Sequence, residues 1–347
     1  MTDLHTTYLG LRLRTPLVAS AGPLTGELDR LTQLADSGAS AIVLPSLFEE
    51  QIEHETAEID RLYAMQAANT PAGTPVAEVD DYNAGPDEYL DLVEEAKRRV
   101  DVPVIASLNG VNVGGWQRYA RLLEDAGADA LELNLYAVAA DPVRTAGDVE
   151  AEQLALVGMI TDDVSIPVAV KISPFYSSLA NFVVALEQAG AAGVVMFNRF
   201  FAPDLDLATL DVRPRMSLSS SRDLTLPLRW IGITRELLTM SIAASTGVHS
   251  GTDAAKVILA GADVAMTTSA LLIHGPGYLA TIELELVEWM RTSGYATIDD
   301  VRGAVRREVA ADPAAYERAT YVGNLTGYAS RYRAAGAASA RGHEPPN

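Results

Sequence analysis

Five short apolar runs, each followed at once by polar residues, constrain the fold of this chain more than any other feature. They are rich in Val, Ile, Leu and Ala and occupy residues 130–134, 168–171, 194–198, 242–246 and 264–269. This composition is typical of parallel strands that helices cover on both faces. The polar residues come at the carboxyl ends, where parallel α/β folds bind their ligands. The pattern therefore predicts both the fold class and the position of a site.

Counting all such runs gives eight candidate strands, with helical patterns such as 89–96 and 117–123 between most of them. The strands are expected at about 17–20, 40–44, 103–108, 129–134, 167–172, 193–198, 241–245 and 263–268. Several helices end in a Gly-Ala pair, at Gly38, Gly127, Gly190 and Gly261, where glycine favours a left-handed exit. We predict an α/β fold, a (β/α)8 TIM barrel; a doubly wound open sheet is the alternative.

Two gaps between the expected strands are too long for simple turns. They run from Phe48 to Pro103 and from Asn198 to Ser241, and predict insertions after strands 2 and 6 that form lids or substrate loops. Closing helices are expected over 278–332. Residues 1–332 are predicted to form a single domain, and 333–347, rich in Ala, Gly and Pro, a disordered tail.

The composition excludes several classes of function. The net charge of −20, with no basic cluster, argues against a nucleic-acid partner. The absence of cysteine removes disulfides, thiolate metal sites and cysteine nucleophiles, and no metal-binding spacing occurs; His249 and His274 are isolated. No secretory pattern or membrane-length apolar run is present, so a cytoplasmic location without membrane contact is expected. The sequence is compatible with a homo-oligomer.

The residues after the last two strands suggest a phosphate site. Thr246-Gly247 and Thr268-Ser269 are small, so backbone N–H groups could approach an anion, and a helix that begins near Thr252 would add a favourable dipole. The alternative is an ordinary strand-to-helix turn, which favours the same residues.

Charged and amide residues end three or four other strands. Lys171 could stabilise negative charge on a reduced ring, or form a structural ion pair with Glu132. Asn109, Asn134 and Asn198 offer both donor and acceptor, as recognition of a flavin edge or a carbonyl substrate requires, although each could instead cap a turn. Glu49 and Glu50 fit the first turn of a helix better than a site.

With these residues in view, the chain resembles the class 1 dihydroorotate dehydrogenases, in particular their dehydrogenase-like branch, over about residues 4–300. The resemblance rests on 15–22, Ser46, Glu132-Leu133-Asn134, Val170-Lys171, Asn198 and the two phosphate loops. It implies tightly bound FMN and hydride transfer from dihydroorotate in pyrimidine biosynthesis. It also implies that FMN contacts Ser20, Ala21, Gly22, Ser46, Asn109, Asn134, Lys171, Thr246, Gly247, Thr268 and Ser269, and that substrate contacts Asn198.

The resemblance has departures on the substrate side. The family has lysine before the flavin-contacting serine, where this chain has Pro45. Where the family has its Cys or Ser base, this chain has Ala137, and Ala139 replaces a substrate asparagine. Loss of a positioned base typically costs about 10²–10⁴ in rate. Tyr136 is the candidate replacement, with Lys171 as the other catalytic candidate, and we expect a substrate other than dihydroorotate.

Three functions follow as hypotheses. The first is an FMN-dependent dehydrogenase acting on the CH–CH bond of a small-molecule substrate. The second is a catalytically quiet FMN-bearing subunit that passes electrons to a redox partner protein; any iron–sulfur cluster would belong to that partner, because this chain has no cysteine. The third is a barrel that binds a phosphorylated metabolite without flavin.

Overall fold

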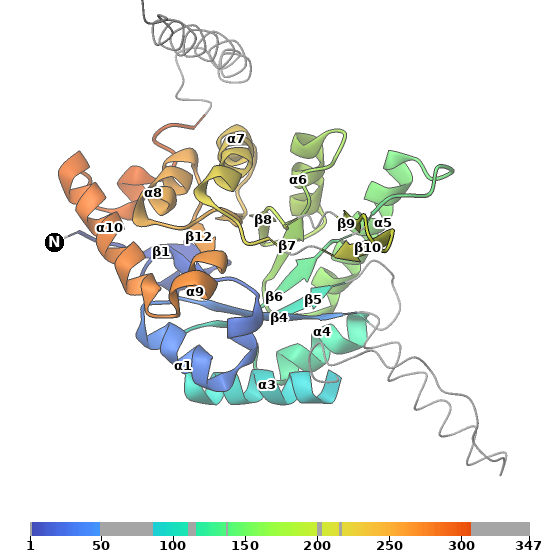
Figure 1. Ribbon diagram of the computed structural model, residues 1–347, viewed down its shortest axis with the longest axis horizontal. Helices are drawn as coiled ribbons and strands as arrows, with labels where there is room; N and C mark the ends of the chain where they lie inside the picture. Colours follow the sequence, from blue (N-terminus) through green and yellow to red (C-terminus); the bar gives the residue numbers. More distant parts are fainter. Residues whose placement is uncertain are drawn as a thin grey trace, which may run out of the picture.

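A closed barrel of parallel strands forms the centre of the molecule (Figure 1). The computed structural model describes residues 2–48, 86–109, 116–136, 138–199, 203–214 and 217–306. Eight strands close in the order β11-β12-β3-β4-β5-β6-β7-β8, which confirms the predicted (β/α)8 barrel and excludes an open sheet. Their bounds are β3 Leu17–Ala19, β4 Ile42–Phe48, β5 Val104–Asn109, β6 Ala130–Asn134, β7 Val168–Ile172, β8 Gly193–Met196, β11 Ser241–Ala244 and β12 Val264–Thr267.

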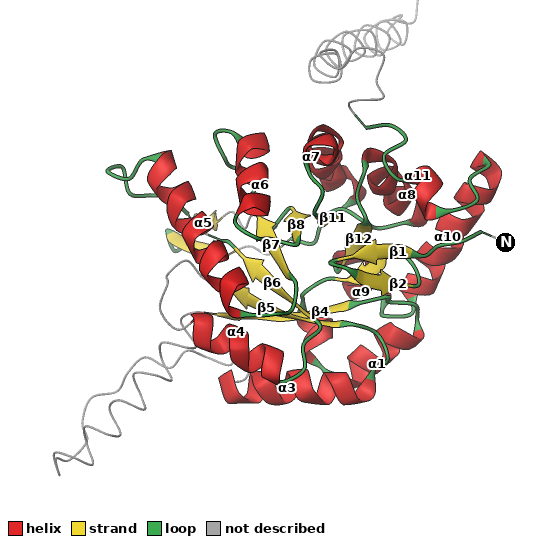
Figure 2. Ribbon diagram, turned by 180° about the vertical axis from the view of Figure 1, so that it is seen from behind, coloured by secondary structure: helices red, strands yellow, loops and turns green. Residues whose placement is uncertain are grey.

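Helices surround the strands, as Figure 2 shows in red and yellow. Each buries one apolar face; in α4, for example, Trp116, Tyr119, Ala120 and Leu123 are buried. None of the described helices is long and apolar enough to cross a membrane. The helices are α1 Leu28–Asp36, α3 Pro86–Arg99, α4 Trp116–Asp125, α5 Ala146–Asp163, α6 Leu179–Gln188, α7 Thr225–Thr234, α8 Gly251–Ala260, α9 Ser269–His274, α10 Tyr278–Ser293 and α11 Ile298–Val301, with 3₁₀ turns η1 Pro23–Gly26, η2 Ser221–Leu224 and η3 Arg235–Leu237.

The predicted glycine exits from the helices are confirmed. Gly38, Gly127, Gly190 and Gly261 all have positive φ, between 93° and 123°. After each of them the chain turns into the next strand, because a residue without Cβ adopts this backbone at little cost.

A small hairpin closes the amino-terminal end of the barrel. Its strands β1 (Thr6–Tyr8) and β2 (Leu11–Leu13) pair antiparallel, and Tyr8, Leu9 and Leu13 pack against barrel residues that include Ala130 and Ala169. Side chains alternate along a strand, so the residues two positions further along β6 and β7 also face the barrel interior. Those residues are Glu132 and Lys171.

Strand β4 extends further than predicted. Its expected end was residue 44, but it continues through Pro45 to Phe48. Proline lacks an N–H and would interrupt a regular ladder. The pairing with β5 accommodates it through a register shift between Val43 and Ser46. By contrast β8 ends at Met196, two residues before the predicted end.

The two long gaps differ in what the structure describes. In the second, a hairpin of β9 (Pro203–Asp206) and β10 (Asp211–Pro214) precedes η2, α7 and η3. Most of the first gap, including Glu49 and Glu50, lies outside the described residues, as do Ala137 and everything after residue 306. The predicted tail and the later closing helices therefore remain predictions, whereas α10 and α11 are helical as expected.

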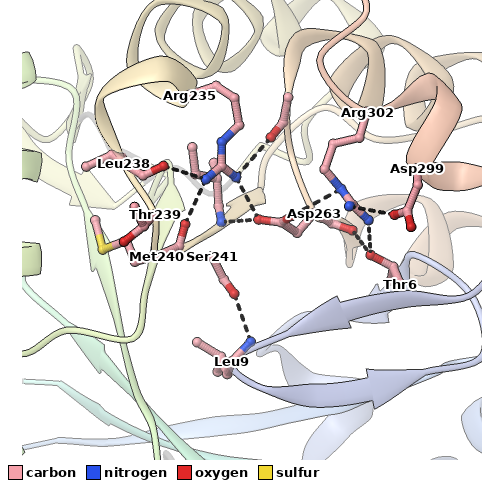
Figure 3. Close-up of polar contacts among 12 residues, drawn as sticks. Thr6, Leu9, Arg235, Leu238, Thr239, Met240, Ser241, Asp263, Asp299 and Arg302 are labelled. Carbon is pink, nitrogen blue, oxygen red and sulfur yellow. Dashed lines mark hydrogen bonds and ion pairs between the residues drawn. The ribbon is translucent and has the colours of Figure 1, made fainter.

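An ionic network centred on Asp263 joins distant elements at the amino-terminal end of the barrel (Figure 3). Asp263 precedes β12, and its Oδ2 accepts from Arg235 Nη1 at 3.0 Å and from the backbone N–H of Ile242 at 2.7 Å. Arg302 Nε lies 3.1 Å from Oδ1, and the hydroxyl of Thr6 donates to the Asp263 carbonyl at 3.0 Å. Elements from β1 to α11 are thereby tied at the end opposite the carboxyl ends of the strands.

Candidate active site

A cavity opens at the carboxyl ends of the barrel strands. Its volume is about 340 Å³, within the range of about 300–1,000 Å³ that small-molecule sites occupy. Every site residue predicted from the sequence lines it: Ser20, Ala21, Gly22, Ser46, Asn109, Asn134, Tyr136, Lys171, Asn198, Thr246, Gly247, Thr268 and Ser269. They come from the ends of all eight barrel strands, which parallel pairing brings to one end of the barrel.

Lys171 and Glu132 form an ion pair beneath this cavity. Lys171 Nζ donates to Glu132 Oε1 at 3.1 Å, and both side chains are buried. Glu132 Oε2 has no hydrogen-bond partner among the described residues. The two interpretations offered for Lys171 are therefore compatible, because the ammonium pairs with Glu132 and also lines the cavity.

The strand-end asparagines lie next to one another. The register pairs Asn109 with Asn134, and Asn134 with Lys171 on the next strand. The Asn198 amide donates from Nδ2 to Oδ1 of Asn134. Among the described residues, Nδ2 of Asn134 and Oδ1 of Asn198 have no other partner, so the pair presents one donor and one acceptor. This suits a planar ring that carries amide or imide groups.

The loop after β11 is held in an uncommon conformation. Thr246 has φ +72°, rare for a residue with a branched side chain, and its hydroxyl donates to the Phe197 carbonyl at 3.1 Å. Gly247 follows with φ +95°, and a Cβ there would lie 2.5 Å from the Leu224 backbone nitrogen. Because the Thr246 hydroxyl braces the loop, the backbone N–H groups are the donors this loop can offer an anion.

The loop after β12 packs against the loop after β3. Thr268 Oγ1 donates to the Ser20 carbonyl at 3.1 Å, and a Cβ at Gly22 would lie 2.5 Å from Thr268 Cγ2. Only glycine therefore permits this approach. The hydroxyl of Ser269 accepts from the backbone N–H of Ser219 at 3.1 Å, which draws a third segment to the same end of the cavity.

Several lining residues escaped the sequence reasoning. Arg199 and the segment 217–219 line the cavity, and Arg199 Nη2 donates to Ser217 Oγ at 3.1 Å. The serine-rich run at 217–221 was the available signal, since polar residues inside a long gap at the ligand face can belong to a substrate loop.

His249, which looked isolated in the sequence, contacts this segment. Its Nε2 lies 3.0 Å from Ser219 Oγ, and its backbone N–H donates to Asp253 Oδ2 at 3.2 Å. Burial lowers the pKa of His249, an effect that the nearby carboxylates of Asp253 and Asp223 only partly oppose. The neutral imidazole is thus the favoured form at pH 7.

Ser46 and Tyr136 complete the opposite wall. Ser46 Oγ lies 2.7 Å from Ser107 Oγ, and Tyr89 links β5 to α3 by donating to the Ser107 carbonyl at 3.2 Å. Tyr136 follows β6 and lines the cavity, but its neighbour Ala137, assigned to the position of the family base, lies outside the described residues.

Comparison with known proteins identifies this arrangement. The family described as dihydroorotate dehydrogenase matches residues 3–290. The chain belongs to this family. The resemblance inferred from the sequence is therefore confirmed, and the barrel with its cavity at the carboxyl ends of the strands is the family's scaffold in this chain.

Relatives are distant but match over most of their length. A chloroplastic dihydropyrimidine dehydrogenase (NADP(+)) from Arabidopsis thaliana is 25% identical over 87% of this chain and 76% of its own. The catalytic subunit of dihydroorotate dehydrogenase B (NAD(+)) from Thermoplasma volcanium is 25% identical over 88% of this chain and 100% of its own. A putative dihydroorotate dehydrogenase A (fumarate) from Aeropyrum pernix is also 25% identical, over 88% of this chain and 98% of its own. These names identify the chain as similar to dehydrogenases.

Proposed function

We propose that this chain is an FMN-dependent oxidoreductase that removes two hydrogens from a CH–CH bond of a small cyclic substrate related to dihydroorotate. The observation that carries the proposal is the convergence of all the predicted site residues on one cavity at the carboxyl ends of the strands. Family membership supports the reaction class.

The cavity residues fit FMN at both of its ends. The loops at Thr246-Gly247 and Thr268-Ser269 offer backbone donors to a phosphate, and none of the described residues that line the cavity is Asp or Glu. Gly22 and Thr268, which pack against each other, both line the cavity and bring the loops after β3 and β12 together there. When bound, FMN would supply the two-electron acceptor.

The side chains of the chain itself would perform the remaining tasks. Lys171 would place positive charge beside a ring that gains electron density, with Glu132 fixing its orientation. Asn134 and Asn198 would orient ring and substrate through their free amide atoms. Tyr136, which directly precedes Ala137 and lines the cavity, would be the candidate replacement for the family base.

Ala137 is the observation that favours the second hypothesis, an FMN-bearing subunit that passes electrons to a partner protein. A chain without the usual base could hold FMN and pass electrons to a partner protein, and stable co-purification with a redox partner would support this. The third hypothesis, a barrel that binds a phosphorylated metabolite, leaves the paired asparagines and Lys171 without a role.

The first test is the visible absorption spectrum of untagged purified protein, followed by anaerobic addition of dihydroorotate. Flavin bands are expected. Their persistence after the addition would indicate another substrate or a partner, whereas bleaching would show a working dihydroorotate dehydrogenase with another base. Preparations that stay colourless and bind no added FMN would contradict the proposal.

A further inference from the structure

We propose that Arg199 is a specificity-determining residue that selects substrates with a ring carboxylate over neutral ones. The inference rests on the proposed function, because it assigns the substrate class of that same cavity. It distinguishes two classes named among the relatives: dihydroorotate, which carries a carboxylate, and dihydropyrimidines, which need not.

Arg199 is placed at the cavity by β8. It follows Asn198, lines the cavity, and has a side chain that is 26% exposed. One terminal nitrogen donates to Ser217 Oγ at 3.1 Å, which fixes the direction of the guanidinium. A guanidinium has five N–H donors, and among the described residues Arg199 donates a hydrogen bond to Ser217 and has Asp223 as an ion-pair partner.

The charge of Arg199 is weakly compensated. The facing carboxylate is that of Asp223, whose Oδ2 lies 4.0 Å from Nη1. This oxygen already accepts from the backbone N–H of Ser220 at 2.7 Å and from its hydroxyl at 3.2 Å. A carboxylate that is engaged elsewhere and at this separation contributes little to an ion pair.

Two cationic side chains line the cavity although the chain carries a net charge of −20. Lys171 and Arg199 are the Lys and Arg side chains among its described lining residues, which include no Asp or Glu. Lys171 is paired with buried Glu132 at 3.1 Å, whereas the described carboxylate that faces Arg199, that of Asp223, lies 4.0 Å away. A partly buried guanidinium can bind a carboxylate through two parallel charge-assisted hydrogen bonds.

The backbone of Arg199 lies next to the residues proposed to bind the ring. Its neighbour Asn198 contacts Asn134 across the ends of β8 and β6, where the ring-binding amide atoms lie. The Arg199 side chain contacts Ser217 and faces Asp223, in the segment that also packs against the predicted phosphate loops at Ser269 and Gly247. Because a phosphate would attract the same guanidinium, the test must separate the two anions.

The test compares orotate with uracil, which share a ring and differ by one carboxylate. Binding of each is measured by titration calorimetry, with wild type, Arg199→Gln and Arg199→Lys as purified. Wild type should prefer orotate by about ten- to a hundredfold, the contribution of hydrogen bonds to a charged group. The glutamine variant should lose this preference and the lysine variant should keep part of it.

Arg222→Gln is the matched control, because it removes the same charge from an exposed site in η2 that does not line the cavity. It should bind orotate like wild type. The inference is overturned if wild type shows no preference or no orotate binding, or if Arg199→Gln keeps the preference. Loss of FMN but not riboflavin from Arg199→Gln would also overturn it, by assigning the residue to the phosphate.

The experiment tests the flavin proposal separately from the role of Arg199, because calorimetry measures orotate binding without a flavin signal. Protein that stays colourless yet binds orotate in an Arg199-dependent manner would refute the flavin proposal and support this one. Protein that holds FMN without the orotate preference would do the reverse.

Discussion

At the residue scale, the pair of Lys171 and Glu132 links stability to function. Both are buried, and Lys171 donates to Glu132 at 3.1 Å. Lys171→Met should lower the free energy of unfolding by about 3–5 kcal/mol, because it leaves a buried carboxylate unpaired. Urea denaturation at pH 7 measures this. The double variant Lys171→Met/Glu132→Gln should recover most of the loss, and a single variant as stable as wild type would contradict the argument.

Most of the candidate site could be read from single residues in the sequence. Asn109, Asn134 and Lys171 each end a strand, and parallel strands bring their carboxyl ends together, so their convergence followed from local pattern alone. Arg199 could not be found in this way. Its role depends on the return of segment 217–219 over the barrel end, which no local pattern encodes.

At the element scale, the loop between β11 and α8 depends on the absence of a side chain at Gly247. Its φ is +95°, and an added Cβ would meet the backbone of Leu224 at 2.5 Å. Gly294 is the matched control, because its φ is +80° and a Cβ added there would have no heavy atom within 4 Å. Gly294→Ala should cost about 1–2 kcal/mol for left-handed backbone alone.

Gly247→Ala should lower the free energy of unfolding by more than Gly294→Ala does. It should also weaken FMN binding, because either the loop after β11 or η2 must move. Denaturation and quenching of flavin fluorescence measure the two effects. Equal losses of stability in the two variants, with unchanged FMN affinity, would show that the contact with Leu224 does not hold the loop.

Glu187 should make stability depend on pH at the junction between α6 and β11. Its Oε1 accepts from Thr239 N–H and hydroxyl at 2.7 Å each and from Met240 N–H at 2.6 Å. Burial raises the pKa of Glu187, but these hydrogen bonds together outweigh it and the pKa is lowered. The carboxylate therefore stabilises the fold above the unfolded pKa of about 4.3, and this stabilisation is lost as pH falls through the folded pKa.

Glu187→Gln should accordingly melt at a lower temperature than wild type at pH 7, and the difference should shrink at about pH 3.5. Thermal unfolding at both pH values tests this. A difference of the same size at both would mean that ionisation of Glu187 does not contribute.

The elements themselves were largely predictable, and the error in the bounds of β4 comes from its pairing with another strand. Gly127 and Gly261 marked helix ends correctly because few residues other than glycine adopt positive φ. The strand expected at 40–44 continues through Pro45 to Phe48, and its pairing with β5 shifts register there. Such a shift depends on the partner strand, so the sequence of β4 alone cannot show it.

At the scale of the whole molecule, the ionic network around Asp263 and the candidate active site lie at opposite ends of the barrel. The cavity lies at the carboxyl ends of the strands, and the network around Asp263 lies at the amino ends (Figure 3). Arg235 and Arg302 reach Asp263 from segments on either side of α8 in the sequence. A substitution in this network should therefore change stability without changing the cavity.

Asp263→Ala is the sharpest test of this division. It would leave two partly buried arginines without their shared carboxylate and the Ile242 N–H without its acceptor, so unfolding should become easier by about 3–5 kcal/mol. Asp299→Ala removes an exposed partner of Arg302 and should cost about 0–1 kcal/mol. FMN affinity, measured well below the melting temperature, should match wild type in both. A stable Asp263→Ala protein with weakened FMN binding would show instead that the two ends of the barrel are coupled.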